Sequence, residues 1–360
     1  MNAAAHFSQS YVEARDKFLA ATAAAGLDAT PHWHPLLGRD GERLAMDVLR
    51  HGPKHADHLL IISSACHGVE GFAGSGIQTG LLSNPDWLAA VAASGVAVLY
   101  IHALNPHGFS WWRRVTQEGV DLNRNFHDFH APLPHNAGYD EIAAALLPAH
   151  WPPSPSNEAL LADYAARHGE RGLQTAISGG QYEHELGLFY GGRAPTWSQQ
   201  TLRHVLEEQT SGVNNLAWID LHTGLGPCGH GERIFAGNDD GLALARARRW
   251  WGETVTSLTD GSSSSSPLVG LMWTVVSQIC PAATYTGIAL EYGTLELAQM
   301  IEALRADHWL AAHPEAPGEQ AAAIKQQIRD AFYVDTDAWK QALLAQALDA
   351  GLQALKGLNE

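Results

Sequence analysis

Cysteine is scarce in this chain. Only three of its 360 residues are cysteines, at positions 66, 228 and 280, and so few thiols do not form the disulfide framework of a small secreted protein. Residues 1–26 have no basic stretch followed by an apolar run, so they do not resemble a signal peptide. We therefore expect a reduced protein that works in the cytoplasm.

Basic residues and long apolar runs are also few. The chain has 22 lysines and arginines against 38 aspartates and glutamates, which gives a formal net charge of −16. Proteins that bind nucleic acid or an anionic membrane surface present a basic face, so neither is expected as a partner. No stretch approaches the roughly 18 consecutive apolar residues of a membrane-spanning helix.

Apolar residues nevertheless make up 46% of the chain, and many lie in short runs typical of buried strands. Two such runs, 58–65 and 96–103, flank a glycine-rich turn and a helix at 71–93 that is interrupted near Asn84-Pro85. Strand, helix and strand in this order predict a right-handed parallel crossover. The sequence therefore predicts an α/β fold, and the further strands expected are 44–49 (as an edge strand), 217–221 and 287–290.

The remaining segments predict mainly helices. We expect helices at 8–25, 294–311 and 318–355, and a short helix at 139–147 inside a long loop, 127–157, that is rich in proline and histidine. Five consecutive serines within 261–267 predict a mobile surface loop. Because no internal repeat and no linker divides the sequence, we expect one domain over residues 1–360, with the motifs described below between about 55 and 295.

Three predicted strands end in residues that can bind a metal or move a proton: His67-Gly-Val-Glu70 after the first, then His222, and finally Glu291. Ligands of such sheets gather beyond the carboxyl ends of the strands. Two histidines and one carboxylate form a standard ligand set for a catalytic Zn²⁺ ion, and a further carboxylate is needed to accept a proton from water. We therefore predict a site for one Zn²⁺ ion bound by His67, Glu70 and His222, with Glu291 as the general base.

Residues beside these ligands allow two interpretations. Asp220 lies two positions before His222 on the same face of a strand, where it either orients that ligand or has a structural role. Cys66 precedes His67, but strand alternation points it away, which predicts a buried cysteine. The glycines of 71–76 follow the order G-x-x-G-x-G, so a dinucleotide-binding loop is excluded.

The most specific motifs lie between Asn105 and Asn125, in the stretch NPHGFSWWRRVTQEGVDLNRN. With N-P-x-G, an arginine and G-V-D-L-N-R-N in this order, and the ligand motifs on either side, the chain resembles zinc carboxypeptidases of the M14 type over residues 55–295. GGQYEHELGLFYGG at 179–192 and APLPHNAGYDE at 131–141 resemble the DUF2817 branch, a neighbour of the aspartoacylase and succinylglutamate desuccinylase group. The resemblance implies a three-layer α/β/α sandwich with a mixed, mostly parallel sheet.

The resemblance also implies residues that contact the substrate. Asn123 and Arg124 match the pair that binds the free carboxylate of the substrate, which a planar guanidinium does through two parallel charge-assisted hydrogen bonds. Arg114 matches the arginine that stabilises the oxyanion, and the adjacent Arg113 is an alternative for that role. A tyrosine is expected to close over the substrate, and Tyr285 and Tyr292 are the candidates.

These assignments imply a zinc-dependent hydrolase that cleaves an amide bond next to a free carboxylate. A carboxypeptidase acting on peptides is the main expectation, and a deacylase acting on small N-acyl amino acids is the alternative. The long segments 127–157 and 180–195 slightly favour the smaller substrate by narrowing the entrance. A non-catalytic binding protein on the same fold would not need all of these side chains. A zinc-buffering protein is disfavoured because the 20 histidines are dispersed. The oligomeric state has no sequence signal.

Overall fold

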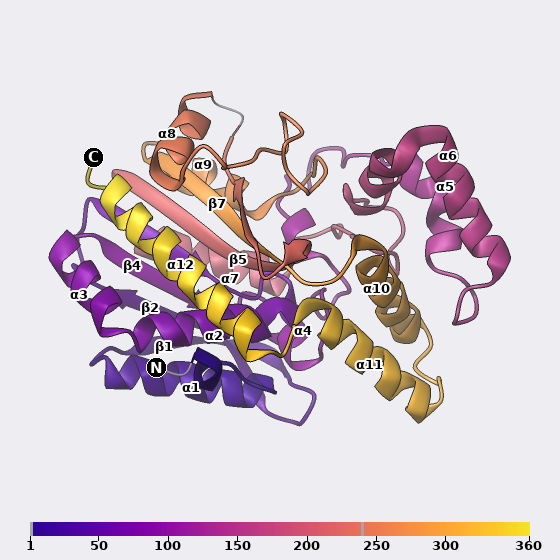
Figure 1. The fold of residues 1–360 in the computed structure, drawn as a ribbon, viewed down its shortest axis with the longest axis horizontal. Helices are drawn as coiled ribbons and strands as arrows, with labels where there is room; N and C mark the ends of the chain where they lie inside the picture. Colours follow the sequence, from indigo (N-terminus) through magenta and orange to yellow (C-terminus); the bar gives the residue numbers. More distant parts are fainter. Residues whose placement is uncertain (1–2, 239–240) are drawn as a thin grey trace.

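A seven-stranded sheet runs through the centre of the computed structural model, which describes residues 3–238 and 241–360 (Figure 1). The strand order is β1-β2-β4-β3-β5-β7-β6. Strands β1, β3, β4, β5 and β7 run in one direction, and β2 and β6 run in the other. The sheet is therefore mixed and mostly parallel, as expected. The strands span Ala29–Leu37 (β1), Arg43–His51 (β2), His58–Ser63 (β3), Ala97–His102 (β4), Asn215–Cys228 (β5), Gly231–Phe235 (β6) and Thr284–Gly293 (β7).

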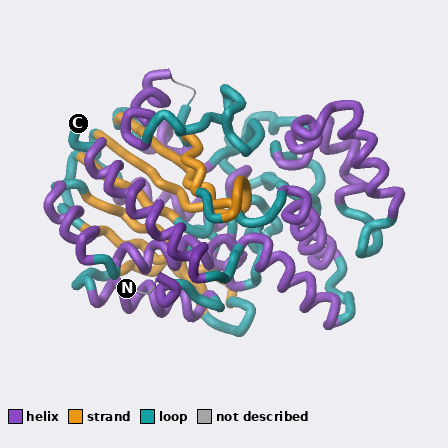
Figure 2. Tube along the Cα trace, viewed as in Figure 1, coloured by secondary structure: helices purple, strands orange, loops and turns teal. Residues whose placement is uncertain are grey.

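Helices cover both faces of this sheet and complete three layers (Figures 1 and 2). Helices α1, α2, α3, α8 and α12 pack on one face, and α7 and α9 on the other. The helices span Tyr11–Ala24 (α1), Gly71–Leu82 (α2), Pro85–Ser94 (α3), Pro106–Ser110 (α4), Ala137–Leu146 (α5), Pro155–Ser178 (α6), Trp197–Gln209 (α7), Gly241–Trp251 (α8), Val275–Ile279 (α9), Leu297–Ala312 (α10), Gly318–Phe332 (α11) and Asp337–Gly357 (α12), and the 3₁₀ turns Ala3–His6 (η1), Gly68–Glu70 (η2), Leu122–Arg124 (η3) and Met272–Thr274 (η4).

The central strands are apolar on both faces because both are covered. In β3, Leu60 and Ile62 belong to the core under α2, whereas Leu59 and Ile61 belong to the core under α7. This two-residue alternation follows the pleat of a strand. Strands covered by helices on both sides are continuously hydrophobic, which explains why β3 and β4 were predictable as short apolar runs.

The predicted strands are found, but the predicted edge is wrong. Segment 44–49 lies in β2, which is flanked by β1 and β4. The edge is β1, which contains Pro31 and Pro35 and is largely exposed on one side. Proline has no N–H to donate and is tolerated on edge strands. The two prolines therefore make the segment hard to recognise as a strand in the sequence, but they are compatible with its position at the edge. Strand β6, at the opposite edge, was not predicted.

The helix predictions hold with two corrections. Residues 71–93 form α2 and α3 with the expected break, but α2 begins at Gly71 without a preceding glycine-rich turn. A close approach explains one of its glycines, because a Cβ atom on Gly74 would lie 2.6 Å from Ser64 Cβ. Segment 318–355 is two helices, α11 and α12, and Thr336 caps the second by accepting a hydrogen bond from the Trp339 amide.

The serine-rich segment 261–267 is a loop, but only its ends are exposed as predicted, at Gly261, Ser262 and Pro267. Ser263, Ser265 and Ser266 are buried. Arg171 of α6 donates hydrogen bonds to the carbonyl oxygens of Ser264, at 3.1 Å, and of Ser265, at 2.6 Å. The Arg171 guanidinium thus holds the loop against α6. The two segments are far apart in the sequence, so no local pattern reveals this contact.

A separate group of helices lies beside the sheet (Figure 1). Helices α5, α6, α10 and α11 share a third apolar core, which includes Ile142, Ile177, Leu304 and Ile328. Helix α6 is kinked at Gly169, where φ is +77°. Among the described residues, no helix combines the length and apolar character needed to span a bilayer.

Gly68 offers a test of how tightly the fold is packed around η2. A Cβ atom on this residue would lie 2.1 Å from the Gly108 carbonyl carbon and 2.3 Å from the Phe109 nitrogen. Since backbone atoms cannot move aside like a side chain, we expect Gly68→Ala to destabilise the protein by at least about 2 kcal/mol. Gly318→Ala is the matched control, because nothing lies within 4 Å of its Cβ position, and it should be neutral or stabilising. Thermal unfolding of both variants measures the difference, and equal melting temperatures would contradict the close contact.

Candidate active site

The carboxyl ends of β3, β5 and β7 bring the predicted site residues together. His67 and Glu70 follow β3, while His222 of β5 is in register with Glu291 of β7. Between β3 and His67 the chain turns sharply at Ala65, whose φ of +57° is unusual for a residue with a side chain. The turn η2 is then fixed by hydrogen bonds from Gly68 N to Arg114 O and from Val69 N to Arg113 O, at 3.0 and 2.8 Å.

The N-P-x-G motif supports this turn and does not itself line the site. Asn105 caps α4 by accepting a hydrogen bond from Gly108 N at 2.8 Å. Gly108 is the residue whose backbone contacts Gly68. The motif therefore helps to position the loop that carries His67.

His67, Glu70 and His222 form a compact, buried cluster. One ligand atom from each lies within 4.8 Å of the other two. Glu70 bridges the histidines, with Oε1 2.8 Å from His67 Nδ1 and Oε2 3.1 Å from His222 Nδ1. Two imidazole nitrogens and a carboxylate that converge in this way form a donor set that could hold a metal ion.

Further carboxylates orient the two histidines from behind. His222 Nε2 lies 2.5 Å from Asp220 Oδ2, and the other oxygen of Asp220 accepts a hydrogen bond from Ser63. His67 Nε2 lies 3.2 Å from Asp121 Oδ1. Carboxylates in this position fix the ring and tautomer of a metal-ligating histidine, which is the first of the two interpretations of Asp220.

Protonation in the cluster is set by the close pairing of these charges. Burial raises the pKa of Glu70, but His67 and His222 outweigh it and hold that pKa below its usual range. Burial lowers the pKa of His222, but Asp220 and Glu70 outweigh it and raise that pKa well above 6.5. Burial, aided by Glu70, raises the pKa of Glu291 to about 7.

Glu291 faces the cluster from β7. It is half-buried, and its Oε1 accepts a hydrogen bond from Leu225 N at 2.9 Å. A carboxylate with a pKa near neutrality can both accept and return a proton at physiological pH. This is the property that a general base at a hydrolytic site needs.

The two neighbouring arginines point to different places. Arg114 donates from Nε to Asp121 at 2.9 Å, and its terminal nitrogens lie 3.3 Å from Glu70 and 2.7 Å from His67. Arg113 instead pairs with Asp307 of α10 at 2.9 Å and does not line the site. Of the two alternatives left open by the sequence, only Arg114 lies beside the metal cluster.

Asn123 and Arg124 lie on η3 at the side of the same site. Arg124 is buried, and its guanidinium donates to the carbonyl oxygens of Ser178 and Asn123. No carboxylate oxygen of the described residues lies within 4.0 Å of it, in contrast to Arg114. The side-chain oxygen Oδ1 of Asn123 accepts a hydrogen bond from Met272 N at 2.9 Å, which leaves its side-chain N–H groups for a ligand. Arg124 is thus a buried cation suited to an external anion.

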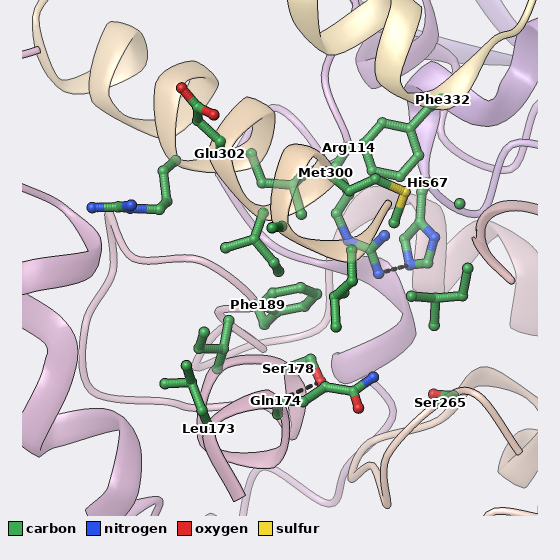
Figure 3. Close-up of a pocket in the computed structure, with 18 of the residues that line it drawn as sticks. His67, Arg114, Leu173, Gln174, Ser178, Phe189, Ser265, Met300, Glu302 and Phe332 are labelled. Atoms are coloured by element: carbon green, nitrogen blue, oxygen red, sulfur yellow. Dashed lines mark hydrogen bonds between the residues drawn. The ribbon is translucent and has the colours of Figure 1, made fainter. Parts of the chain in front are cut away.

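All of these groups open into one cavity of about 980 Å³ (Figure 3). Its lining includes the metal cluster, Arg114, Asn123, Arg124 and Glu291. Phe189 stands between the two arginines, with its ring centroid 5.0 Å from Arg114 Cζ and 5.6 Å from Arg124 Cζ. Phe189 lies within the stretch 179–192 that carries the family resemblance, but no sequence pattern indicated a role for it in the site.

The tyrosine predictions do not hold. Neither Tyr285 nor Tyr292 lines the cavity. Tyr292 is fully buried and donates to Leu343 O at 3.0 Å. Tyr285 packs in the core on the other side of the sheet. Alternation along β7 explains Tyr292, which follows Glu291 and therefore points to the opposite face. Tyr285 instead lies near the start of β7, at the other end of the strand from Glu291.

Cys66 is a buried cysteine, as predicted, although it lies closer to the site than expected. Its sulfur is within 4.8 Å of ligand atoms of Asp220 and His222. Burial and the nearby carboxylates raise the pKa of its thiol well above the usual value. Cys66 is therefore a neutral thiol behind His222 and a poor metal ligand as it stands.

Metal binding should release protons from this site. Since His222 carries a proton at neutral pH and Glu291 titrates near pH 7, a cation that binds there must displace protons. We expect the affinity for Zn²⁺ to rise with pH, about tenfold per pH unit for each proton released. Calorimetry in two buffers of different ionisation enthalpy counts the protons, and Asp220→Asn should reduce the count by lowering the pKa of His222. A heat of binding independent of the buffer would contradict the protonated state of His222.

Comparison with solved structures identifies the fold. The structure of bovine thrombin-activatable fibrinolysis inhibitor in complex with tick carboxypeptidase inhibitor matches with a TM-score of 0.50 and 12% identity over 98% of both chains. Carboxypeptidase A from Helicoverpa armigera gives 0.43 and 12%, over 90% of this chain and 74% of the other. The ectoine utilization protein of Ruegeria pomeroyi gives 0.35 and 14%, over 79% and 67%. The first match confirms the expected carboxypeptidase-like α/β fold, and at such identity it shows the fold alone.

Sequence comparison gives the family. A search of the curated proteins found no match. The family model described as "Protein of unknown function (DUF2817)" matches residues 7–346. Because this match covers nearly the whole chain, the protein belongs to the DUF2817 family.

Proposed function

We propose that this protein is a zinc-dependent hydrolase that cleaves an amide bond next to a free carboxylate, acting on peptides as a carboxypeptidase. The observation that carries the proposal is the meeting of three groups in one cavity. These are a cluster of candidate metal ligands, a glutamate with a pKa near 7, and a buried arginine whose hydrogen-bond partners among the described residues are backbone carbonyl oxygens. Each has a separate task in amide hydrolysis.

The metal ligands in this proposal are His67, Glu70 and His222. A bound Zn²⁺ ion would supply Lewis-acid polarisation of the scissile carbonyl and a lowered pKa for water. Glu291 takes a proton from the attacking water and returns it to the leaving nitrogen.

The arginines divide the anionic groups of the substrate between them. Arg124 and the amide of Asn123 bind the free carboxylate. Arg114 keeps one N–H on each terminal nitrogen beyond those directed at Glu70 and His67, because a guanidinium has five donors. These remaining donors stabilise the negative charge that develops on the carbonyl oxygen.

A deacylase acting on N-acyl amino acids needs the same groups and is the alternative. The size of the cavity, about 980 Å³, favours peptides over the smallest acyl amino acids. Segments 127–157 and 180–195 contribute Pro152, Pro153 and Phe189 to the cavity lining, but they leave this volume open. A panel of peptides and N-acyl amino acids, with products read by mass spectrometry, separates the two activities, and stepwise loss of C-terminal residues would establish the carboxypeptidase.

Replacing the proposed base should separate catalysis from metal binding. Glu291→Gln keeps an oxygen that can accept from Leu225 N and is not a metal ligand in the proposal, so we expect turnover to fall by at least about a thousandfold with zinc content unchanged. His222→Ala should lose zinc as well as turnover. Metal analysis and initial rates on the same preparations test both. Near-normal turnover by the Gln variant would remove Glu291 from the role of base.

Arg124 should control recognition of the free carboxylate. We expect Arg124→Gln to lower kcat/KM by roughly ten- to a hundredfold, since a hydrogen bond to a charged group contributes about 1.5–3 kcal/mol. The loss should disappear for substrates whose carboxylate is converted to an amide, because these are already poorly bound. Arg113→Gln, which alters the neighbouring arginine outside the cavity, is the control and should keep activity on both substrates. Equal losses on acid and amide substrates would contradict the assignment.

A further inference from the structure

The cavity continues well beyond the metal cluster, between α6 and α10. The first helix contributes Leu161, Leu173 and Ile177 to this part of the lining, and the second contributes Leu297, Ile301 and Leu304. Figure 3 shows Leu173, Gln174 and Ser178 along one side and Met300 and Glu302 along the other, with Phe189 between them. Apolar side chains of the two helices therefore face each other across this extension, unlike the charged residues at its inner end.

At the inner end of this extension, both helices lie next to proposed functional residues. A Cβ atom on Gly224 would lie 3.1 Å from Met300 Cε and 3.3 Å from Glu291 Oε1, so Met300 of α10 adjoins the proposed base. On the other side, the Ser178 carbonyl of α6 holds Arg124. A substrate whose carboxylate lies on Arg124 and whose amide lies near Glu291 therefore has its next atoms at the entrance to the apolar extension.

Carboxylates line the outer part of the cavity. Glu158, Glu170, Glu296 and Glu302 are exposed lining residues. Within the described part of the chain, only Glu158 forms an ion pair, with Arg305 at 2.9 Å. A second carboxylate on the substrate would be repelled here, whereas an uncharged or cationic end would not.

We propose that the extension between α6 and α10 binds the acyl side of the substrate as an apolar chain with no negative charge. The inference rests on the proposed hydrolase and names its substrate class. Such a chain has two sources, the aliphatic acyl group of an N-acyl amino acid or the apolar residues that precede the last residue of a peptide. Diacid acyl groups such as succinyl do not fit, because they would place a carboxylate among the glutamates.

The test is a chain-length series on one leaving amino acid. Acetyl, hexanoyl and decanoyl derivatives of that amino acid, and free dipeptides ending in it with glycine or leucine before it, are compared by kcat/KM. We expect an increase of up to about fourfold per methylene buried, and adipoyl should be at least about tenfold worse than hexanoyl. A greater gain in the acyl series would identify acyl amino acids as the source, and a greater gain from glycine to leucine would identify peptides. A flat response in both series would overturn the inference.

Two tryptophan variants locate the effect in the cavity. Ala162 and Ala166 are both exposed residues of α6, but only Ala162 lines the cavity. Ala162→Trp should abolish the chain-length gain, and Ala166→Trp should retain it. If both variants kept the full chain-length gain, the chain would have to bind elsewhere.

Binding to the Glu291→Gln variant separates failure of this inference from failure of the proposed function. Calorimetry with the same acyl amino acids reports affinity without turnover. Affinity that rises with chain length in a protein that hydrolyses none of the substrates would retain the apolar extension and reject the hydrolase. Hydrolysis of the acetyl substrate with no gain from length would retain the hydrolase and reject the extension.

Discussion

The burial of Glu70 is the constraint on which the site depends. A carboxylate removed from water is costly unless every oxygen has a partner. Glu70 meets this requirement through His67, His222, Arg114 and the backbone N–H of Thr223. These contacts join the turn after β3 to the end of β5, so the charge that must be satisfied also brings the ligands together.

The residues around Glu70 and the two histidines are also paired with groups of opposite charge. Asp220 and Asp121 lie behind the histidines, and Arg114 lies beside Asp121. Arg124 is different, because its partners are neutral carbonyl oxygens. The arrangement leaves one strong cation available to an outside anion, whereas a core balanced for stability alone would pair it.

The sheet and the separate group of helices contribute differently to the site. Parallel strands covered on both faces fix the positions of the ligands and Glu291. Helices α5, α6, α10 and α11 form their own core. Of these, α6 and α10 supply most of the side chains that line the rest of the cavity. Binding sites on α/β sheets lie at the carboxyl ends of the strands, and here the added helices turn that edge into a deep cavity.

The sequence by itself determined the local features that depend on short-range patterns. Runs such as His58–Ser63 predict buried strands because a strand covered on both faces must be apolar throughout. The order of H-x-x-E and G-V-D-L-N-R-N along the chain predicted residues that the fold brings to one cavity. Tertiary structure alone decided which of Arg113 and Arg114 enters the site, because adjacent residues have equal local signals and differ only in whether Asp307 or Asp121 lies within reach. It also decided that β1 forms the edge of the sheet, that Arg171 holds the serine-rich loop against α6, and that Phe189 lies beside both Arg114 and Arg124. Each of these depends on contacts between residues far apart in the chain, which no pattern of neighbouring residues encodes.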